Sequence, residues 1–363
     1  MKPATFAVLN NTALRHNLNV VRQYAPGAKV MAVIKANGYG HGLIRVAKEL
    51  RTSDAFAVAR VDEGIRLRKA GITQRIVVLE GFVCHEELAL IERFQMETVL
   101  HCDEQLDMLE SIDTANYINC WLKLDTGMHR LGFDVTQVTR VINRINQCRS
   151  IAKPVPLMTH LANADDVNDS ATDQQIKIFN NVTAHISEQR SIANSSGILE
   201  WKTSLSDWVR PGIMLFGVSP FSNKNGTEYG LKPALTLYSK LLAIKDLKVG
   251  DAVGYGGLWV CKRPMKLGVI ATGYGDGYPR SAASNTPVLV NGCRAPLVGR
   301  VSMDMITVDL THCQSARIGD QVVLWGEELP VEEIARCAST IPYTLMCGIT
   351  QRVMIIEEEI DRN

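Results

Sequence analysis

Short apolar runs alternate with amphipathic stretches through the first two-thirds of the chain. In the stretches between the runs, apolar residues recur three or four positions apart, as Leu14, Leu18 and Val21 do, which is typical of helices with one buried face. About eight such units in roughly 220 residues predict an α/β fold, a (β/α)8 barrel, rather than a doubly wound sheet. The predicted strands are residues 30–34, 56–59, 76–79, 98–100, 121–124, 156–159 and a run around 213–216, and helices are expected at 43–50 and 63–70.

The pattern changes near residue 230. Apolar or small residues then alternate with different ones at period two, and the segment Val288–Cys293 contains an Asn-Gly hairpin signal. Residues 331–339 form the one clear helix of this part. We therefore predict a barrel domain over residues 1–229 and a mostly β domain over residues 230–363. The alternating positions are Leu235, Leu237, Ser239 and Leu241.

Charge and composition narrow the classes of function. Lys and Arg total 39 against 38 Asp and Glu, which gives no electrostatic case for nucleic acid or for an acidic membrane surface. No apolar run reaches the length of a membrane span, and the first residues lack the apolar core of a signal peptide, so we expect a cytoplasmic protein. The nine cysteines form no C-x-x-C pair. They predict reduced thiols rather than a disulfide framework or a zinc site, and we expect no metal.

The most informative segment is Ala32–Gly42, which reads AVIKANGYGHG. Its apolar run places Lys35 at the carboxyl end of a strand, where α/β barrels build their sites. A lysine desolvated there has a lowered pKa and can form an imine with a carbonyl cofactor. On position alone, a solvated lysine at a strand end is an equal alternative.

Two further segments follow predicted strands. The segment Arg210–Ile213 comes after the last barrel strand, where backbone N–H groups of Gly212 and Ile213 can hold a phosphate. In the segment Leu122–Gly132, Lys123 lies within a strand and Arg130 follows it. Arg130 is suited to clamp a substrate carboxylate or a cofactor oxygen.

These segments resemble those of alanine racemases, which are pyridoxal-phosphate enzymes of the barrel class. The resemblance covers nearly the whole chain, with the blocks in the family's order. It is carried by Ala32–Gly42, Leu122–Gly132, Asn194–Gly197, Arg210–Ile213, Val253–Gly257, Gly299–Asp304 and Ile341–Cys347. It implies the cofactor pyridoxal 5′-phosphate, interconversion of L- and D-alanine, and a homodimer. D-Alanine would then be supplied for peptidoglycan or used catabolically.

The resemblance also implies roles at the reacting carbon and the cofactor ring. Lys35 and Tyr255 would be the two bases, Tyr255 acting in the partner subunit's site, because racemisation needs an acid/base group on each face of the carbon. Arg210 would face the pyridine nitrogen, with His160 hydrogen-bonded to it. Lys123 would be carbamylated and would hold Arg130.

The remaining implied roles concern the phosphate, the substrate carboxylate and the entrance. Ser195, Tyr39 and Tyr343 would contact the phosphate together with Gly212 and Ile213. The backbone N–H of Met303 would bind the substrate carboxylate. Tyr274 and Asp304 would line the entrance from the partner chain.

Three other functions share part of this pattern. A racemase of another or broader specificity would carry the same motifs. A barrel-type decarboxylase would need a cysteine-aspartate segment that we do not find. A non-catalytic pyridoxal-phosphate carrier would resemble the barrel alone, so residues 230–363 and Tyr255 argue against it.

Overall fold

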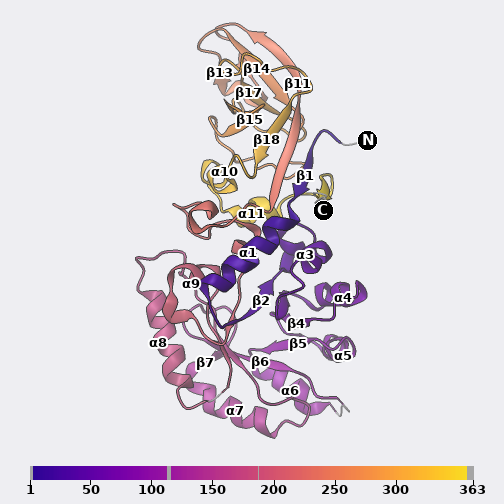
Figure 1. The fold of residues 1–363 in the computed structure, drawn as a ribbon, viewed down its shortest axis with the longest axis vertical. Coiled ribbons are helices and arrows are strands. Elements are labelled where there is room, and N and C mark those ends of the chain that lie inside the picture. Colours follow the sequence, from indigo (N-terminus) through magenta and orange to yellow (C-terminus); the bar gives the residue numbers. More distant parts are fainter. Residues whose placement is uncertain (1–2, 113–115, 187, 358–363) are drawn as a thin grey trace. The chain divides into compact units, whose positions relative to one another are not determined.

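The computed structural model describes residues 3–112, 116–186 and 188–357. The chain divides into two compact units, which are described separately here. One consists of residues 17–215, and the other combines the residues up to 16 with those from 216 onward. In Figure 1 the ribbon is coloured by residue number, and the colours distinguish the helix-rich unit from the strand-rich unit.

The unit of residues 17–215 is a closed parallel barrel, as predicted. Its strands pair in the order β2-β3-β4-β5-β6-β8-β9-β10, and β10 pairs with β2 to close the ring. A short strand β7 (Phe133–Asp134) adds to β6 outside the ring. The barrel strands are β2 (Lys29–Val33), β3 (Ala55–Val58), β4 (Arg75–Val78), β5 (Glu97–Leu100), β6 (Cys120–Asp125), β8 (Leu157–Met158), β9 (Arg190–Ser191) and β10 (Trp208–Val209).

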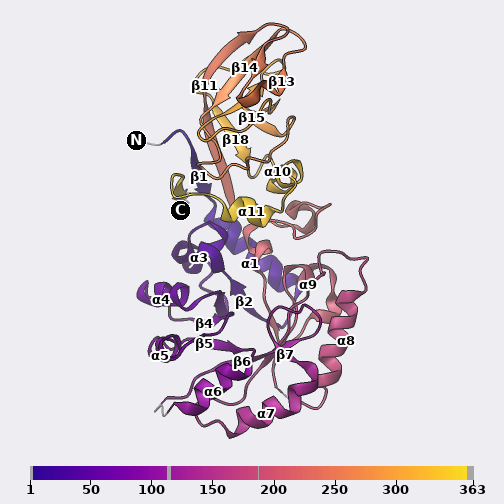
Figure 2. The ribbon, with the colours of Figure 1, turned by 180° about the vertical axis from the view of Figure 1, so that it is seen from behind.

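Helices alternate with these strands and present an apolar face to them. Asn10 caps the amino-terminal end of the first helix, because its side-chain oxygen accepts a hydrogen bond from the Ala13 N–H at 2.9 Å. Figures 1 and 2 show α3, α4 and α5 along the outside of the strands. The helices of this part of the chain are α1 (Asn11–Tyr24), α2 (Lys35–Tyr39), α3 (Leu43–Glu49), α4 (Val61–Lys69), α5 (His85–Arg93), α6 (Asp103–Ser111), α7 (Val138–Gln147), α8 (Ala171–Thr183) and α9 (Ser195–Glu200).

One predicted strand of the barrel region is wrong. Residues 213–216 form a 3-10 helix, and the last barrel strand is β10, just before Arg210. The run Ile213–Phe216 is fully buried. A short buried apolar run has no periodicity to separate strand from helix, so its sequence favoured neither. The strand β9 was not predicted, because two residues are too few to show a periodicity.

The other unit is built mainly on antiparallel strands and includes β1 (Phe6–Leu9). The long strand β11 (Leu235–Leu247) pairs with β1, β14 and β18, and its residues alternate between buried and less buried at first, as predicted. β15 and β16 form the predicted Asn-Gly hairpin. The remaining strands are β12 (Ala252–Val253), β13 (Trp259–Val260), β14 (Met265–Ile270), β15 (Pro287–Val290), β16 (Cys293–Pro296), β17 (Ile306–Asp309), β18 (Gln321–Trp325) and β19 (Met354–Glu357).

The two units differ from the predicted domain limits of 1–229 and 230–363. Residues up to 16 belong to the β unit because β1 pairs with β11 and β19, strands that lie more than 200 residues further along the chain. Residues 216–229 also belong to that unit. Beside the predicted helix, found as α10 (Val331–Cys337), the β unit has a second one, α11 (Pro342–Cys347).

The expectation that the cysteines are all reduced is wrong for one pair. Cys293 and Cys313 form a disulfide, with their Cα atoms 5.8 Å apart. Cys293 begins β16 and Cys313 lies in the turn after β17, so only the folded sheet brings them together. The other seven cysteines are not part of a disulfide.

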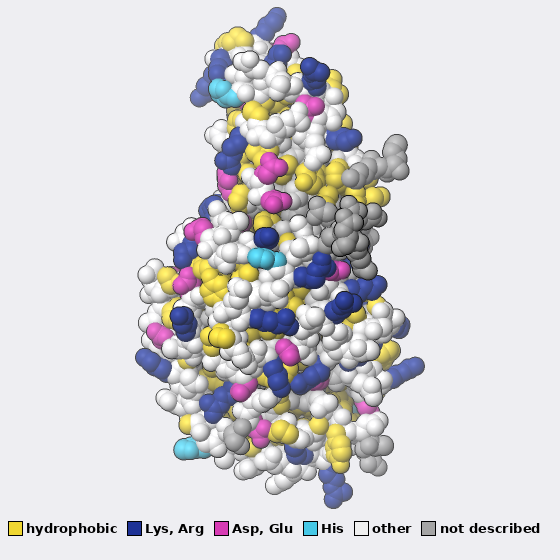
Figure 3. Space-filling view, viewed as in Figure 1, with side chains coloured by type: hydrophobic (Ala, Val, Ile, Leu, Met, Phe, Trp, Pro, Cys, Tyr) yellow, Lys and Arg dark blue, Asp and Glu magenta, His cyan; other side chains and the backbone are white. Residues whose placement is uncertain are grey.

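The surface agrees with the balanced composition. Lys and Arg side chains are interspersed with Asp and Glu on the face seen in Figure 3. None of the described helices is both long enough and apolar enough to cross a membrane.

Candidate active site

Lys35 lies at the carboxyl end of β2, where it opens the short helix α2. The backbone after it is unusual, because Ala36, Asn37 and Tyr39 all have positive φ values, between 51° and 56°. Left-handed backbone costs of order 1 kcal/mol at each residue that is not glycine, and such strain gathers at functional sites. The turn therefore fixes Lys35 and Tyr39 in a conformation that the surrounding structure must hold.

Polar contacts from neighbouring segments hold this turn. The Asn37 N–H donates to Glu63 Oε1 at 3.4 Å, and Asn37 Oδ1 accepts from the Leu43 N–H at 3.2 Å. The ring nitrogen Nδ1 of His41 lies 2.8 Å from the Tyr39 carbonyl oxygen. Burial lowers the pKa of His41 to about 4, so its imidazole is neutral at physiological pH.

Tyr39, Ser195 and Gly212 meet beside Lys35's strand. Ser195 is buried at the first position of α9, and its Oγ accepts hydrogen bonds from the N–H groups of Gly212 (2.9 Å) and Met214 (3.4 Å). A Cβ at position 212 would lie 2.4 Å from the Tyr39 hydroxyl oxygen. Only glycine allows this close approach, so backbone amide, serine hydroxyl and phenol converge at one point.

Arg210 is buried at the carboxyl end of β10. Its Nη1 donates to the Ser191 carbonyl (2.9 Å) and to Ser191 Oγ (2.6 Å), and its Nη2 donates to the Thr159 carbonyl and lies 3.4 Å from His160 Nδ1. Burial lowers the pKa of Arg210 to about 10, which still leaves it a cation at neutral pH. Burial and the charge of Arg210 hold the pKa of His160 well below its ordinary range, so His160 accepts rather than donates at Nδ1.

Lys123 points from β6 into the same region. Its pKa falls to about 8, first because it is buried and then because Arg210, Arg130 and Lys35 carry like charges. Arg130 follows a turn closed by Asp125, whose Oδ1 accepts hydrogen bonds from the N–H groups of Gly127, Met128 and His129. The turn thus carries Arg130 toward the other cations.

The site is therefore strongly positive. Within the described part of the chain, no carboxylate forms an ion pair with Arg130 or Arg210. Arg130 and Arg210 therefore keep positive charge that a bound anion would compensate. A phosphate beside Ser195 and Gly212, and a carboxylate near Arg130, fit it well, so these residues suit pyridoxal phosphate and an amino acid. The cationic side chains are Lys35, Lys123, Arg130 and Arg210, and the neutral imidazole of His160 lies among them.

The other predicted residues lie in the β unit. Tyr255 begins a 3-10 turn between β12 and β13 and is 68% exposed. The Tyr274 N–H donates to the Ser302 carbonyl, and the Gly275 N–H donates to the Met303 carbonyl, so these two loops run side by side. Met303 is 53% exposed.

Asp304 and Tyr343 complete the predicted set. Arg352 joins Asp304 (2.9 Å) to the buried Asp276 (3.4 Å), which fixes the loop after Met303. Tyr343 is half-buried in α11. Tyr255, Tyr274, Met303, Asp304 and Tyr343 thus belong to one unit, and the Lys35 group belongs to the other.

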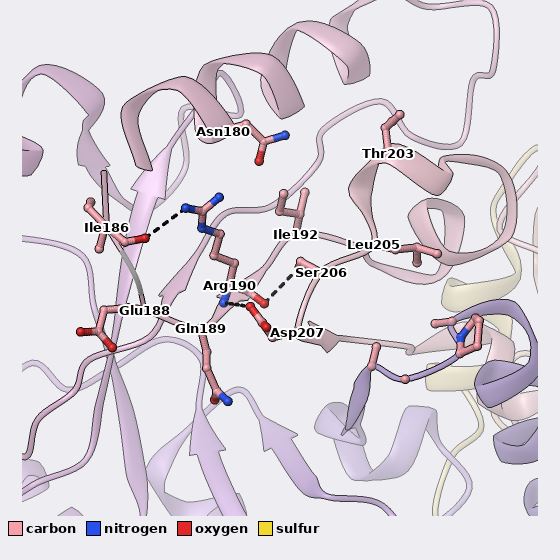
Figure 4. Close-up of a pocket in the computed structure, with 14 residues that line it drawn as sticks. Asn180, Ile186, Glu188, Gln189, Arg190, Ile192, Thr203, Leu205, Ser206 and Asp207 are labelled. Carbon is pink, nitrogen blue, oxygen red and sulfur yellow. Dashed lines mark hydrogen bonds between the residues drawn. The ribbon is translucent and has the colours of Figure 1, made fainter. Parts of the chain in front are cut away.

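A pocket of about 730 Å³ lies elsewhere on the barrel, at the amino-terminal ends of β2, β9 and β10 (Figure 4). In its wall the Arg190 N–H donates to Asp207 Oδ2 at 2.8 Å, and Arg190 Nη2 donates to the Ile186 carbonyl at 3.1 Å. All barrel strands are parallel, so this end is opposite the one that carries Lys35 and Arg210. Active sites of such barrels form at the carboxyl ends, and the pocket is separate from the candidate site.

Several residues that shape the site were not predicted. Glu63, Thr126, Thr159 and Gln175 are all buried polar residues whose hydrogen bonds reach the loops of the site. Glu63 lies three residues after Arg60, the N-cap of α4. A glutamate that caps a helix is common at this position, so the sequence did contain a signal for its role. Gln175 carried none, because its partners are distant in sequence. In the described ranges, no group of three or more His, Cys, Asp or Glu side chains is placed to hold a metal ion.

Comparison with known proteins matches both units. The family model "Alanine racemase, N-terminal domain" matches residues 9–220, and "Alanine racemase, C-terminal domain" matches residues 234–356. The alanine racemases of Vibrio vulnificus (strain CMCP6) and Shewanella loihica are each 48% identical to the chain. The matches cover 97% of this chain and 98% of the first relative, and 99% of this chain and 100% of the second.

Solved structures agree with the sequence relatives. The biosynthetic alanine racemase of Pseudomonas aeruginosa superposes with a TM-score of 0.95 at 40% identity, over 99% of this chain and 100% of that one. The alanine racemase of Bartonella henselae, solved with covalently bound pyridoxal phosphate, gives a TM-score of 0.89 at 28% identity, over 98% and 99%. The chain thus belongs to the alanine racemase family and is an amino-acid racemase.

Proposed function

We propose that the protein interconverts L- and D-alanine with pyridoxal 5′-phosphate, using Lys35 and Tyr255 of the partner subunit as the two bases. The observation that carries this proposal is the concentration of basic side chains around Lys35 at the carboxyl ends of the barrel strands. It suits a phosphate and a carboxylate held at one reactive amine. When bound, the cofactor supplies the electron sink that makes the α-proton of alanine removable.

Each base acts on one face of the α-carbon. The Lys35 amine takes or returns the proton on its own face, from a turn whose backbone is held by Glu63 and Asn37. The Tyr255 phenol acts on the opposite face. Its exposure on the β unit fits a side chain that works in a neighbouring subunit.

The other residues bind and orient. Ser195, Gly212, Ile213, Tyr39 and Tyr343 would hold the phosphate. The hydrogen bond from the Gly212 N–H to Ser195 Oγ places the serine hydroxyl at the start of the 3-10 helix, where an anion is favoured. Arg210 would donate a hydrogen bond to the ring nitrogen of the bound cofactor and would keep its own proton. Its hydrogen bonds to carbonyl groups and to His160 fix its direction.

Lys123 and Arg130 form a second pair. Because the pKa of Lys123 is lowered to about 8, part of its amine is neutral near physiological pH. The neutral amine adds to carbon dioxide and releases a proton, which gives a carbamate anion. That anion compensates the charge of Arg130, which then orients the substrate carboxylate together with the Met303 N–H of the partner subunit.

A two-fold dimer follows from these assignments, since Tyr255, Met303, Tyr274 and Asp304 would complete the partner's site and its entrance. Exposed apolar side chains at Tyr255, Leu258 and Met303 support a subunit interface there.

We place the enzyme in the cytoplasm and its D-alanine in peptidoglycan synthesis. Catabolic use of D-alanine is the alternative, and growth of a deletion strain that depends on added D-alanine would favour synthesis.

The direct test is D-alanine formation from L-alanine by purified, cofactor-loaded protein, with L-serine, L-lysine and L-arginine in parallel. We expect conversion confined largely to alanine, whereas conversion of the other amino acids would indicate a broader racemase.

Lys35→Ala should abolish both activity and the visible absorbance of lysine-bound cofactor. Tyr255→Phe should bind cofactor normally and racemise poorly, and full activity in this variant would refute its role as a base. Bound cofactor without any D-product would favour the carrier function.

A further inference from the structure

Gln175 lies on α8, outside the residues assigned to binding or chemistry, yet its carboxamide is buried and forms three hydrogen bonds. Its Oε1 accepts from the Ala162 N–H at 2.9 Å. Its Nε2 donates to the His160 carbonyl at 3.1 Å and to Thr126 Oγ1 at 3.3 Å. Gln175 therefore joins the loop after β8 to the loop after β6.

The contacts continue from Gln175 to Arg210 along two routes. Thr126 Oγ1 lies 2.8 Å from Thr159 Oγ1, and the Thr159 carbonyl accepts a hydrogen bond from Arg210 Nη2. The second route passes through His160, whose Nδ1 lies 3.4 Å from the same Nη2. Gln175, Thr126, Thr159 and Arg210 are each less than 5% exposed, so water does not compete for these bonds.

Only a side chain that both donates and accepts hydrogen bonds, as an amide does, can make these contacts at position 175. A carboxylate cannot donate to the His160 carbonyl or to Thr126, and an apolar side chain of the same size would leave the Ala162 N–H and the His160 carbonyl without their partner. The loop after β6 also carries the turn that leads to Arg130. One amide thus ties together the segments that bear Arg130, His160 and, through Thr159, Arg210.

We propose that Gln175 is a positioning residue of the racemase, which locks the loops after β6 and β8 together and thereby fixes the direction of Arg210. This inference rests on the proposed role of Arg210 at the cofactor ring. A buried side chain that orients a catalytic group affects the rate through geometry, and a displacement of about 1 Å can cost on the order of a hundredfold in rate.

The barrel offers a matched control. Gln105 is buried as deeply, and it joins two other loops in the same way: its Oε1 accepts from the His101 N–H at 2.8 Å and its Nε2 donates to the Phe82 carbonyl at 3.1 Å. Neither of those loops carries a residue assigned to the site. Gln175→Met and Gln105→Met remove the same kind of bonds from similar surroundings, without adding charge or changing length.

The test compares these variants with the wild-type holoenzyme. We expect Gln175→Met to lower kcat for L-alanine at least about tenfold with little change in KM. We also expect it to shift the pH at which the visible absorbance of the bound cofactor titrates. Gln105→Met should lower the melting temperature by a similar amount and leave kcat and the absorbance titration unchanged. Thr126→Val, which keeps the shape and removes the hydroxyl link, provides the same test if Gln175→Met does not fold.

Unchanged kcat and absorbance in Gln175→Met and Thr126→Val would overturn the positioning role. An equal fall of kcat in Gln105→Met would also overturn it, because it would reveal a general effect of loosened loops. A wild-type protein that neither binds the cofactor nor racemises alanine would instead refute the proposed function.

Discussion

At the scale of single residues, Lys123 shows how the fold sets the chemistry of one amine. Its ordinary pKa of 10.5 falls to about 8 because the half-buried ammonium is partly desolvated and lies near the like charges of Arg210, Arg130 and Lys35. Between these two values the unfolded chain binds more protons at Lys123 than the folded protein does. The free energy of unfolding therefore rises with pH through this window, and below about pH 8 the Lys123 ammonium destabilises the fold.

This linkage predicts a difference between variants. In buffer free of carbon dioxide and without cofactor, Lys123→Met should have a higher free energy of unfolding than the wild type at neutral pH. The free energy of unfolding of the wild type should rise between about pH 8 and pH 10 through deprotonation of Lys123, and the variant should lack this rise. Urea titrations at the two pH values measure it. Lys202→Met, at an exposed lysine of the same unit, is the control. Equal pH dependence in wild type and Lys123→Met would contradict the lowered pKa.

At the scale of elements, the amino end of the barrel is held by one buried carboxylate. Glu97, at the start of β5, accepts from Arg75 Nη2 on β4 at 2.8 Å and from Trp121 Nε1 on β6 at 2.8 Å. The ring of Trp121 packs edge-on against that of Trp208 on β10, with centroids 5.6 Å apart. Four strands are thus connected at the end of the barrel opposite Lys35.

Removing that carboxylate should affect stability and spare the chemistry. Glu97→Ala leaves the Trp121 N–H and the Arg75 guanidinium without their acceptor, which should lower the free energy of unfolding by about 2 kcal/mol. Urea denaturation measures this, and kcat and KM should stay near their wild-type values at low temperature. A variant as stable as the wild type would show that the contact contributes nothing, and a changed KM would link this end of the barrel to the site.

At the scale of the whole molecule, the division of the predicted site between two units has a consequence that mixing can test. Lys35 belongs to the barrel, whereas Tyr255 belongs to the β unit. If each site combines Lys35 of one subunit with Tyr255 of the other, a dimer of one Lys35→Ala and one Tyr255→Phe chain has one intact site. Random exchange of the two inactive variants should then restore about a quarter of wild-type activity.

The measurement is the racemase rate after the two variants are unfolded together and refolded, or co-expressed. Each variant refolded alone is the control and should stay inactive. Absence of recovery, in a mixture whose mixed dimers are demonstrated by mass, would show that Tyr255 does not act in the partner's site.

The sequence by itself determined the fold class, and it predicted the residues of the candidate site. Strand and helix periodicity predicted the barrel because each element must present an apolar face to the same core. That requirement appears as a pattern within each short segment of the sequence. The motifs around Lys35, Arg210 and Tyr255 were readable because each is a short contiguous segment. The β hairpin at Asn291-Gly292 was predicted for the same reason, since both residues adopt the positive φ that such a turn requires.

Only the tertiary structure decided the features that join distant segments. The pairing of β1 with β11 and β19, the disulfide between Cys293 and Cys313, and the hydrogen bonds of Gln175 each connect residues that no local pattern relates. The run at residues 213–216 forms a 3-10 helix, which the sequence could not predict because a short, fully buried apolar run shows no periodicity. Local periodicity fixes which face of an element is buried, whereas the partner of that face is set by the packing of the whole chain.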